Sequence, residues 1–337
     1  MKPISLFISL TFVAAALAGC AADESGDNMT TTSPVTTTPV TTPTTDNETP
    51  DGPPDVDPRC LAPPADAAEV NASTRLGMPE LSFTTSDPSE ADPCYRFHGP
   101  QNATSGWNVF TLTYPAPGQT FHIMPMYFIG EHTMEDVLAA FASSPEGEAP
   151  EWAVPSGAVG GVTPGSSGSV AIDLDVGNHV YFCPIEGHML QGMMGMLAVT
   201  EAENETAAPE ADAAIELVDF NFTVPDLTAD MTVIRVTNNG SEPHEAPLVK
   251  LMGGATMSQF LATLEDPDAT GPPPGQLIGG VNAIAPGQTV YLLVDLEAGQ
   301  DYGMACFIPS PAHGGAPHVA IGPMVVDFTV QDDAAEA

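Results

Sequence analysis

Alternating apolar and polar positions predict short strands along most of the chain between residues 58 and 331. Segments such as VAIDLDV, HVYFC, TVYLLVDL and MVVDFTV are rich in β-branched residues and are bounded by Gly or Pro. This pattern is typical of strands in an antiparallel sandwich or barrel. Two other segments, TMEDVLAAF and TMSQFLATL, have helical character. The pattern therefore predicts an all-β fold with one short helical insertion in each half of this region.

The second half of this region repeats the landmarks of the first half. Each half contains a His with a Pro three residues later, the helical segment, Gly-Gly-Val, Pro-Gly, Asp-Leu and a final Cys. The paired landmarks are His122/Pro125 and His244/Pro247, 160–162 and 279–281, 164–165 and 286–287, 173–174 and 295–296, and Cys183 and Cys306. Cys183 lies 61 residues after His122, and Cys306 lies 62 residues after His244. Because this period is too long for a solenoid unit, it indicates a duplicated domain.

The repeat divides the chain into two predicted tandem domains. The first copy spans residues 58–203 and the second copy spans residues 213–331. An acidic, Ala-rich linker at 204–212 joins them, and an acidic tail follows at 332–337.

The N-terminus has the features of an export signal. Lys2 precedes an apolar stretch that is too short for a comfortable membrane span, and the sequence LAGC that ends at Cys20 resembles the lipobox of lipoproteins. The resemblance implies that residues 1–20 are a lipoprotein signal and that Cys20 takes a lipid; a plain signal peptide is the alternative. Residues 21–57 are rich in Thr and Pro, which predicts a disordered stalk. We therefore expect an exported protein, held on the outer face of the cytoplasmic membrane by its lipid anchor only.

The charge of the chain restricts its partners. Lys and Arg total 6 against 44 Asp and Glu, which gives a formal net charge of −38. Such a field repels nucleic acid and anionic lipid headgroups, so we expect no nucleic-acid partner and a docking partner that is basic or neutral. An acid excess with so few lysines also suits strong brine, where salt screens the self-repulsion. A halophilic source is therefore expected.

The segment CPIEGHMLQGM at the end of the first copy carries a candidate metal site. Cys183, His188 and Met193 lie close together on it, and His122 comes from a distant strand. A thiolate, two imidazoles and a weak thioether suit a copper ion that changes between Cu(I) and Cu(II). Zinc usually takes four firm nitrogen or sulfur ligands. A catalytic Cys–His pair would need an orienting third group, for which the sequence offers no candidate.

His122 followed by Cys-x4-His-x4-Met is similar to the cupredoxins, the blue copper group of plastocyanin, azurin and auracyanin. The resemblance covers both copies and implies a Greek-key β-sandwich or barrel in each. It implies a type 1 copper site with His122, Cys183 and His188 as equatorial ligands and Met193 as the axial ligand. The exposed edge of the loop His would serve as the electron port. Two neighbours of the axial Met, Met194 and Met196, remain alternatives to it.

The second copy keeps these ligand types on a longer loop. His244, Cys306, His318 and Met324 match the pattern, although one Pro is inserted between Gly and Met. We choose His318 over His313 because the Gly four residues later repeats the spacing of the first copy, which makes His313 a surface loop residue. Met324 is a provisional axial ligand. The expected cofactors are therefore two type 1 copper ions.

Cys60 and Cys94 are the two cysteines that remain. They are expected to form a disulfide, because we expect the protein to be exported.

The histidine pattern bears on function. Copper nitrite reductases and multicopper oxidases also stack cupredoxin domains, but they join their centres through a His-Cys dipeptide and use His-x-His pairs. Here Cys183 follows Phe182, Cys306 follows Ala305, and no His-x-His occurs.

We therefore expect an electron carrier without catalytic residues, whose partners are the redox donor and acceptor proteins of a membrane electron-transport chain. A copper oxidoreductase subunit and a copper storage or delivery protein are the alternatives.

Overall fold

The computed structural model describes residues 58–61, 74–118, 121–143, 149–204, 206–266, 268–322 and 324–332. The predicted signal peptide, the lipid acceptor Cys20 and the stalk lie outside the described residues, as does nearly all of the acidic tail. Within the described ranges, no helix is long and apolar enough to cross a membrane.

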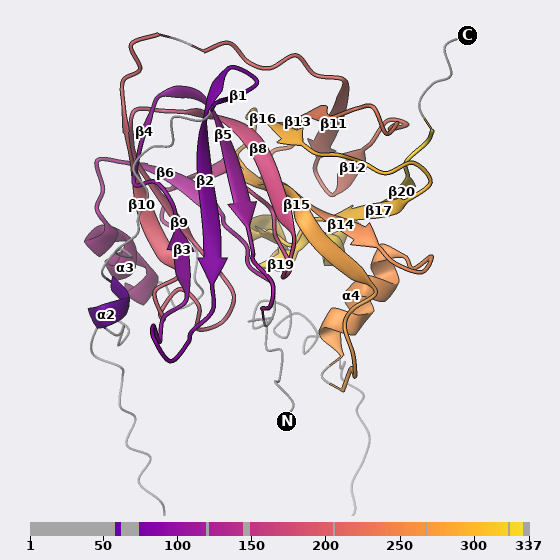
Figure 1. The fold of residues 1–337 in the computed structure, drawn as a ribbon, viewed down its shortest axis with the longest axis horizontal. Helices are drawn as coiled ribbons and strands as arrows, with labels where there is room; N and C mark the ends of the chain where they lie inside the picture. The colour runs from indigo at the N-terminus through magenta and orange to yellow at the C-terminus, as the bar shows by residue number, and fades with distance from the viewer. Residues whose placement is uncertain are drawn as a thin grey trace, which may run out of the picture.

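Strands are the main secondary structure of both copies, as the hydropathy pattern predicted (Figure 1). The elements of the first copy are α2 Pro58–Leu61, β1 Thr74–Arg75, β2 Met78–Ser86, β3 Arg96–His98, β4 Asn102–Thr104, β5 Gly106–Thr113, β6 Met126–Gly130, α3 Met134–Ser143, β7 Val154–Gly157, β8 Ser167–Leu174, β9 Gly177–Phe182 and β10 Met194–Thr200.

The second copy follows the same order with a more elaborate last loop. Its elements are β11 Ala213–Val218, β12 Asn221–Thr223, β13 Val233–Asn238, β14 His244–Leu251, α4 Met257–Glu265, β15 Gly275–Ile284, β16 Thr289–Leu293, β17 Asp301–Ala305, β18 Pro309–Ser310, the 3-10 helix η1 Pro311–His313, β19 Ala316–Pro317, α5 His318–Ile321 and β20 Val325–Thr329. The predicted all-β class is confirmed.

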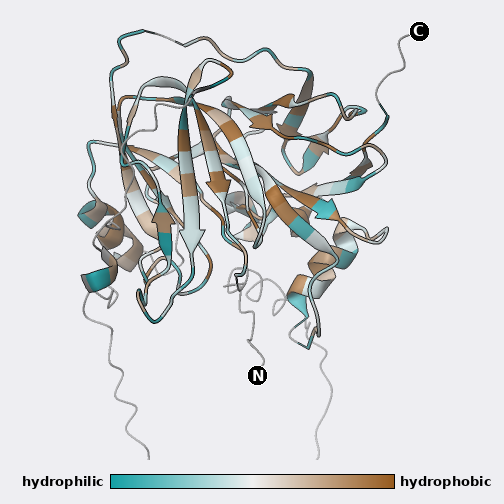
Figure 2. Cartoon of the chain, viewed as in Figure 1, coloured by the Kyte–Doolittle hydropathy of each residue, from teal (hydrophilic) through white to brown (hydrophobic). Residues whose placement is uncertain are grey.

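The two predicted helical segments form as α3 and α4, and both begin with reciprocal capping contacts. Thr256 caps α4 in a capping box with Gln259. At α3, the Thr133 amide donates to the Asp136 carboxylate at 2.8 Å, and the Asp136 amide donates back to the Thr133 hydroxyl at 3.3 Å. Each helix then buries an apolar face, on which Val137 and Phe260 are examples. Figure 2 shows hydrophobic and hydrophilic residues on both helices.

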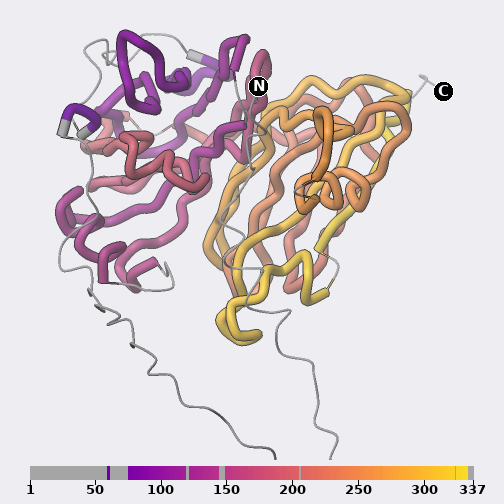
Figure 3. Tube along the Cα trace, turned by 90° about the horizontal axis from the view of Figure 1, so that it is seen from below, coloured from indigo at the N-terminus to yellow at the C-terminus, as the bar shows by residue number. Residues whose placement is uncertain are grey.

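Two large mixed sheets run through both copies. One has the order β1-β2-β5-β8-β16-β13-β11-β12, with β3 paired to β2. The other has the order β20-β17-β14-β15-β7-β6-β9-β10-β4. Each sheet therefore passes from one copy to the other, through the pair β8·β16 in the first sheet and the pair β15·β7 in the second. Figure 3 shows the two copies side by side, with the first in indigo to magenta and the second in orange to yellow.

The register at β8·β16 follows the internal repeat. Val170 pairs with Leu292, and each lies six residues after the Pro of its own Pro-Gly landmark. On either side of this pair the partners exchange places, because Ser169 pairs with Leu293 and Ala171 pairs with Tyr291. A pseudo-two-fold axis therefore passes beside Val170 and Leu292.

The Gly-Gly landmarks meet at the same junction. The Gly160 amide donates to the Gly280 carbonyl at 3.0 Å, and the Gly161 amide donates to the Gly279 carbonyl at 3.1 Å. The backbones approach so closely that a Cβ on Gly160 would lie 2.6 Å from the Gly279 carbonyl oxygen. Glycine is needed where two backbones come this close. The landmark thus specifies how the copies pack together.

One apolar core is continuous between the copies. Phe110 and Val170 of the first copy share it with Ile215, Leu248 and Leu292 of the second, and all of these side chains are buried. Both metal-site cysteines also belong to this core, so the candidate centres adjoin it.

Candidate metal centres

The first candidate centre combines one strand pair with one loop. His122 lies before β6, where its backbone pairs with Val162. Cys183 directly follows β9, and His188 and Met193 lie between β9 and β10. The loop closes on itself, because the Cys183 amide donates to the Met193 carbonyl and the Met193 amide donates to the His188 carbonyl, both at 2.9 Å. The structure thus brings together all four residues predicted for this site, and all four side chains are buried.

The donor atoms of this centre converge. His122, Cys183 and His188 each offer one ligand atom, and these atoms lie within 4.8 Å of one another. The Cys183 sulfur is 3.5 Å from His188 Nδ1. His122 Nε2 lies 3.1 Å from an Asp87 carboxylate oxygen, whereas His122 Nδ1 is buried with no hydrogen-bond partner. A buried polar atom without a partner is costly, so this nitrogen is suited to a metal ion.

Aromatic rings and one carboxylate surround the first centre. Asp87 contacts His122 and also accepts a hydrogen bond from the Tyr114 hydroxyl at 2.6 Å. Tyr95 stacks on the His188 ring, with centroids 3.8 Å apart and planes at 17°. His188 is therefore only 5% exposed, so the exposed edge that the resemblance implied for the loop His is not found, and its counterpart His318 is 0% exposed.

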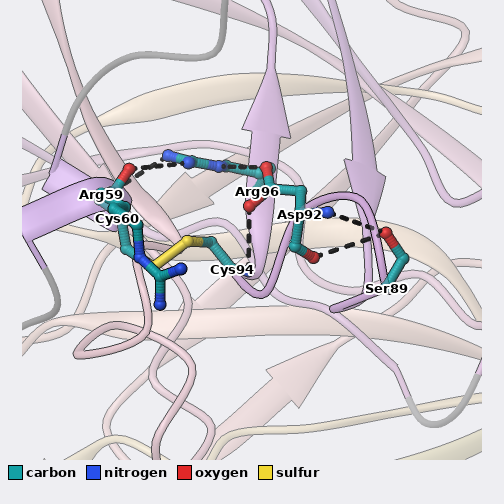
Figure 4. Close-up of a disulfide and its surroundings, with 6 residues drawn as sticks. All are labelled: Arg59, Cys60, Ser89, Asp92, Cys94 and Arg96. Atoms are coloured by element: carbon teal, nitrogen blue, oxygen red, sulfur yellow. Dashed lines mark hydrogen bonds and ion pairs between the residues drawn. A yellow bond between two sulfur atoms is a disulfide. The ribbon is translucent and has the colours of Figure 1, made fainter.

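The Cys60–Cys94 disulfide joins α2 to the segment that precedes β3 (Figure 4). Arg96 lies beside it and donates to the Arg59 carbonyl at 3.0 Å and to the Cys60 carbonyl at 3.1 Å. A Cβ on Gly192 of the loop would lie 2.7 Å from the Cys60 carbonyl oxygen. This disulfide, which joins the pair expected from the sequence, therefore supports the wall of the first centre.

The second candidate centre has the same plan. His244 begins β14, Cys306 directly follows β17, His318 begins α5 and Met324 precedes β20. The Cys306 amide donates to the Met324 carbonyl at 3.0 Å, as Cys183 does to Met193 in the first copy. All four side chains are again buried, with His244 and His318 both 0% exposed. The choice of His318 is supported by this placement, whereas His313 is exposed on η1.

The donors of the second centre lie even closer together. His244 Nδ1 is 2.9 Å from His318 Nδ1, and the Cys306 sulfur is 3.4 Å from His318 Nδ1 and 4.0 Å from His244 Nδ1. His244 Nε2 contacts Asp219 at 3.1 Å, and His318 Nε2 contacts Glu242 at 2.9 Å. When both Nε2 atoms donate to carboxylates, both Nδ1 lone pairs point at each other and at the thiol. A bound cation would accept both lone pairs and so remove the repulsion between them, as in carboxylate–histidine–metal triads.

Backbone amides approach both sulfurs in the same way. The amide after the first His and the amide two residues after the Cys hydrogen-bond the sulfur, which gives Ile123 and Ile185 at Cys183. Glu245 and Ile308 do so at Cys306. Such donors favour the thiolate, which is the form that binds metal.

Burial sets the protonation of the donors. It lowers the pKa of His122 and of His188 to about 4, so both rings are neutral near pH 7 and can act as ligands. Burial raises the pKa of the Cys183 thiol to about 12 and also raises the pKa of Cys306. A binding metal must therefore displace a thiol proton at each centre.

The carboxylates that hold the imidazoles were not predicted. Asp87 and Asp219 could have been found, because each directly follows the first long strand of its copy, β2 or β11. Glu242 has no such signal, since Thr120 stands at the corresponding position two residues before His122.

The other histidines lie outside both donor groups. His98 is on β3 and contacts Ser86, His132 stacks on Trp152, and the buried His179 on β9 contacts the Asp175 carbonyl. His179 is therefore a strand side chain outside the donor groups.

Comparisons with known proteins gave structural neighbours only. No family model matches the chain, and no curated protein matches its sequence. The chain is similar to a solved structure of auracyanin B (17% identity, 40% of this chain and 96% of that chain covered, TM-score 0.27). It is also similar to the copper nitrite reductase from Nitrosomonas europaea (15% identity, 77% and 95% covered, TM-score 0.23) and to a multicopper oxidase (14% identity, 83% and 98% covered, TM-score 0.25). With TM-scores this low, the case for the centres is the geometry of the chain's own residues.

That geometry fits copper. Two buried His–Cys–His groups, each with a buried Met whose carbonyl accepts from the Cys amide, provide a soft donor set that suits copper. The two-sheet β fold therefore carries two candidate copper sites, one in each copy.

Proposed function

We propose that the chain binds two type 1 copper ions and carries single electrons between partner proteins outside the cytoplasmic membrane. His122, Cys183, His188 and Met193 would hold one copper, and the second copy's His244, Cys306, His318 and Met324 would hold the other. Copper would supply one-electron redox chemistry at each centre. The residues of the chain supply fixed donors and exclude water.

The burial of both donor groups carries this proposal. The two His residues and the Cys of each group are at most 5% exposed. A metal that binds substrate needs an open coordination position and a path to it, whereas an electron carrier needs neither. A sealed centre with donors held by carboxylates and backbone amides also keeps its geometry when its charge changes, which favours rapid electron exchange.

The decisive experiment is copper loading of the full-length chain with measurement of bound copper and the visible spectrum. We expect two coppers per chain and an intense thiolate-to-copper band. Cys183→Ser and Cys306→Ser should each remove one copper. As a control, His179→Gln changes a buried His outside the donor groups and should leave both coppers in place.

Other outcomes separate the competing functions. Colourless, zinc-loaded protein would refute the copper assignment. Turnover of nitrite or of a phenolic reductant would favour an oxidoreductase subunit. Copper that exchanges readily with a chelator, without an intense band, would favour storage or delivery.

We also propose that Cys20 carries the lipid that holds the protein at the membrane, so that its redox donor and acceptor are membrane-associated or exported proteins. The net charge of −38 favours basic docking surfaces on these partners.

A further inference from the structure

We infer that the second copy holds the low-potential site of the pair and that the Glu242 carboxylate sets the difference from the first site. The inference rests on the proposed copper function. It follows from how each imidazole is held on the side that faces away from the thiol.

The first imidazole is held in the same way in both copies. His122 Nε2 lies 3.1 Å from Asp87, and His244 Nε2 lies 3.1 Å from Asp219. Each contact therefore acts on its own site, and Asp87 is the better shielded of the two, because its side chain is 14% exposed against 37% for Asp219.

The loop imidazole is held differently in the two copies. His318 Nε2 contacts Glu242 Oε2 at 2.9 Å, and the other oxygen of Glu242 accepts from the Ser310 hydroxyl at 2.9 Å. The ring of its counterpart His188 instead stacks on the uncharged Tyr95 ring. Besides the buried Glu245, which accepts from the Phe307 amide and stands where the first copy has Ile123, the second centre thus has Glu242 as a further carboxylate that the first lacks.

This extra carboxylate is placed where its charge acts strongly. The His318 side chain is 0% exposed and the Glu242 side chain is 17% exposed, so little water screens the pair. Phe220 covers the same ring edge-on, with centroids 5.1 Å apart and planes at 85°.

A carboxylate on the outer nitrogen of a ligating imidazole makes that ligand a stronger donor. Its negative charge also stabilises Cu(II) more than Cu(I), because the oxidised ion carries one more positive charge. Both effects lower the reduction potential. With both coppers bound, one electron shared between them would therefore reside at equilibrium on the copper of the first copy, leaving that of the second copy oxidised.

The test is redox titration of the visible band in copper-loaded, full-length single-site proteins. Cys183→Ser leaves the second site and Cys306→Ser leaves the first. We expect the lower potential in Cys183→Ser. Glu242→Gln, added to Cys183→Ser, should make reduction of the second site at least tenfold more favourable, which is about 59 mV for one electron. Gln keeps an oxygen for His318 and an amide for Ser310 but removes the charge.

Glu265→Gln in the same background is the matched control, because it removes one negative charge from an exposed position at the end of α4. A second-site potential equal to or above the first would overturn the inference, and this comparison needs no change at Glu242. A Glu242→Gln shift no larger than the Glu265→Gln shift would overturn the role of Glu242. Failure of both single-site proteins to show the band would instead refute the copper function itself.

Discussion

Replacing Gly160 with Ala should destabilise the junction between the two copies. The new Cβ would lie 2.6 Å from the Gly279 carbonyl oxygen and 2.9 Å from Pro247 Cα. Both are backbone atoms, so neither can move aside as the end of a side chain does, and the sheets must separate locally. Overpacking of this kind costs about 1–3 kcal/mol. For a cost near the middle of that range, about 2 kcal/mol, we expect the melting temperature to fall by about 4–8 °C.

Gly161, the neighbour of Gly160, provides the control. At Gly161 the nearest atoms to an added Cβ are the flexible Leu277 side-chain methyls, at 3.3 and 3.5 Å. Gly161→Ala should therefore cost less than about 1 kcal/mol, even though the two glycines are adjacent in one strand pairing. Thermal unfolding of the metal-free chain, followed by circular dichroism, measures both. Equal melting temperatures for the two variants would show that the copies do not pack through this Gly-Gly junction.

Three further outcomes are expected. Met193→Leu should shift the potential of the first site, measured by redox titration of the visible band, whereas Met194→Leu should not; the reverse result would move the axial role to Met194. Cys94→Ser opens the bridge to Cys60, which spans 34 residues, and should lower the free energy of unfolding in denaturant by about 3–4 kcal/mol if the chain-entropy term dominates; no change would argue against a supporting role for the bridge. Cys20→Ser should release the protein from membranes in cell fractionation, and retention would refute the anchor.

The repeat predicted the centres well because the chemistry of a metal site is carried by residue type and spacing. His122 and Cys183 are far apart in sequence, yet the second copy preserves their spacing within one residue. The structure brings both sets of donors together, and the buried His318 rather than the exposed His313 joins the second set.

The contacts around the donor groups could not be predicted from the sequence. Tyr95 reaches His188 from a separate irregular segment, and Glu242 reaches His318 across 76 residues of chain. Such contacts depend on how a long loop folds back, and local spacing carries no information on that. The pairing between copies was missed for a related reason, since Gly160–Gly280 contacts join two positions that the sequence presents only as a repeated turn-like motif.

The register at the junction has a consequence for how the chain is assembled. Equivalent strands of the two copies pair with each other across this two-fold axis. Such a pairing is an isologous interface of the kind found in C2 homodimers. The chain is thus organised as a homodimer whose subunits are covalently fused, and the segment 204–212 keeps their effective concentration high. A single copy produced alone would leave the paired edges of β8 and β7 open, so it should associate with itself through the same edges.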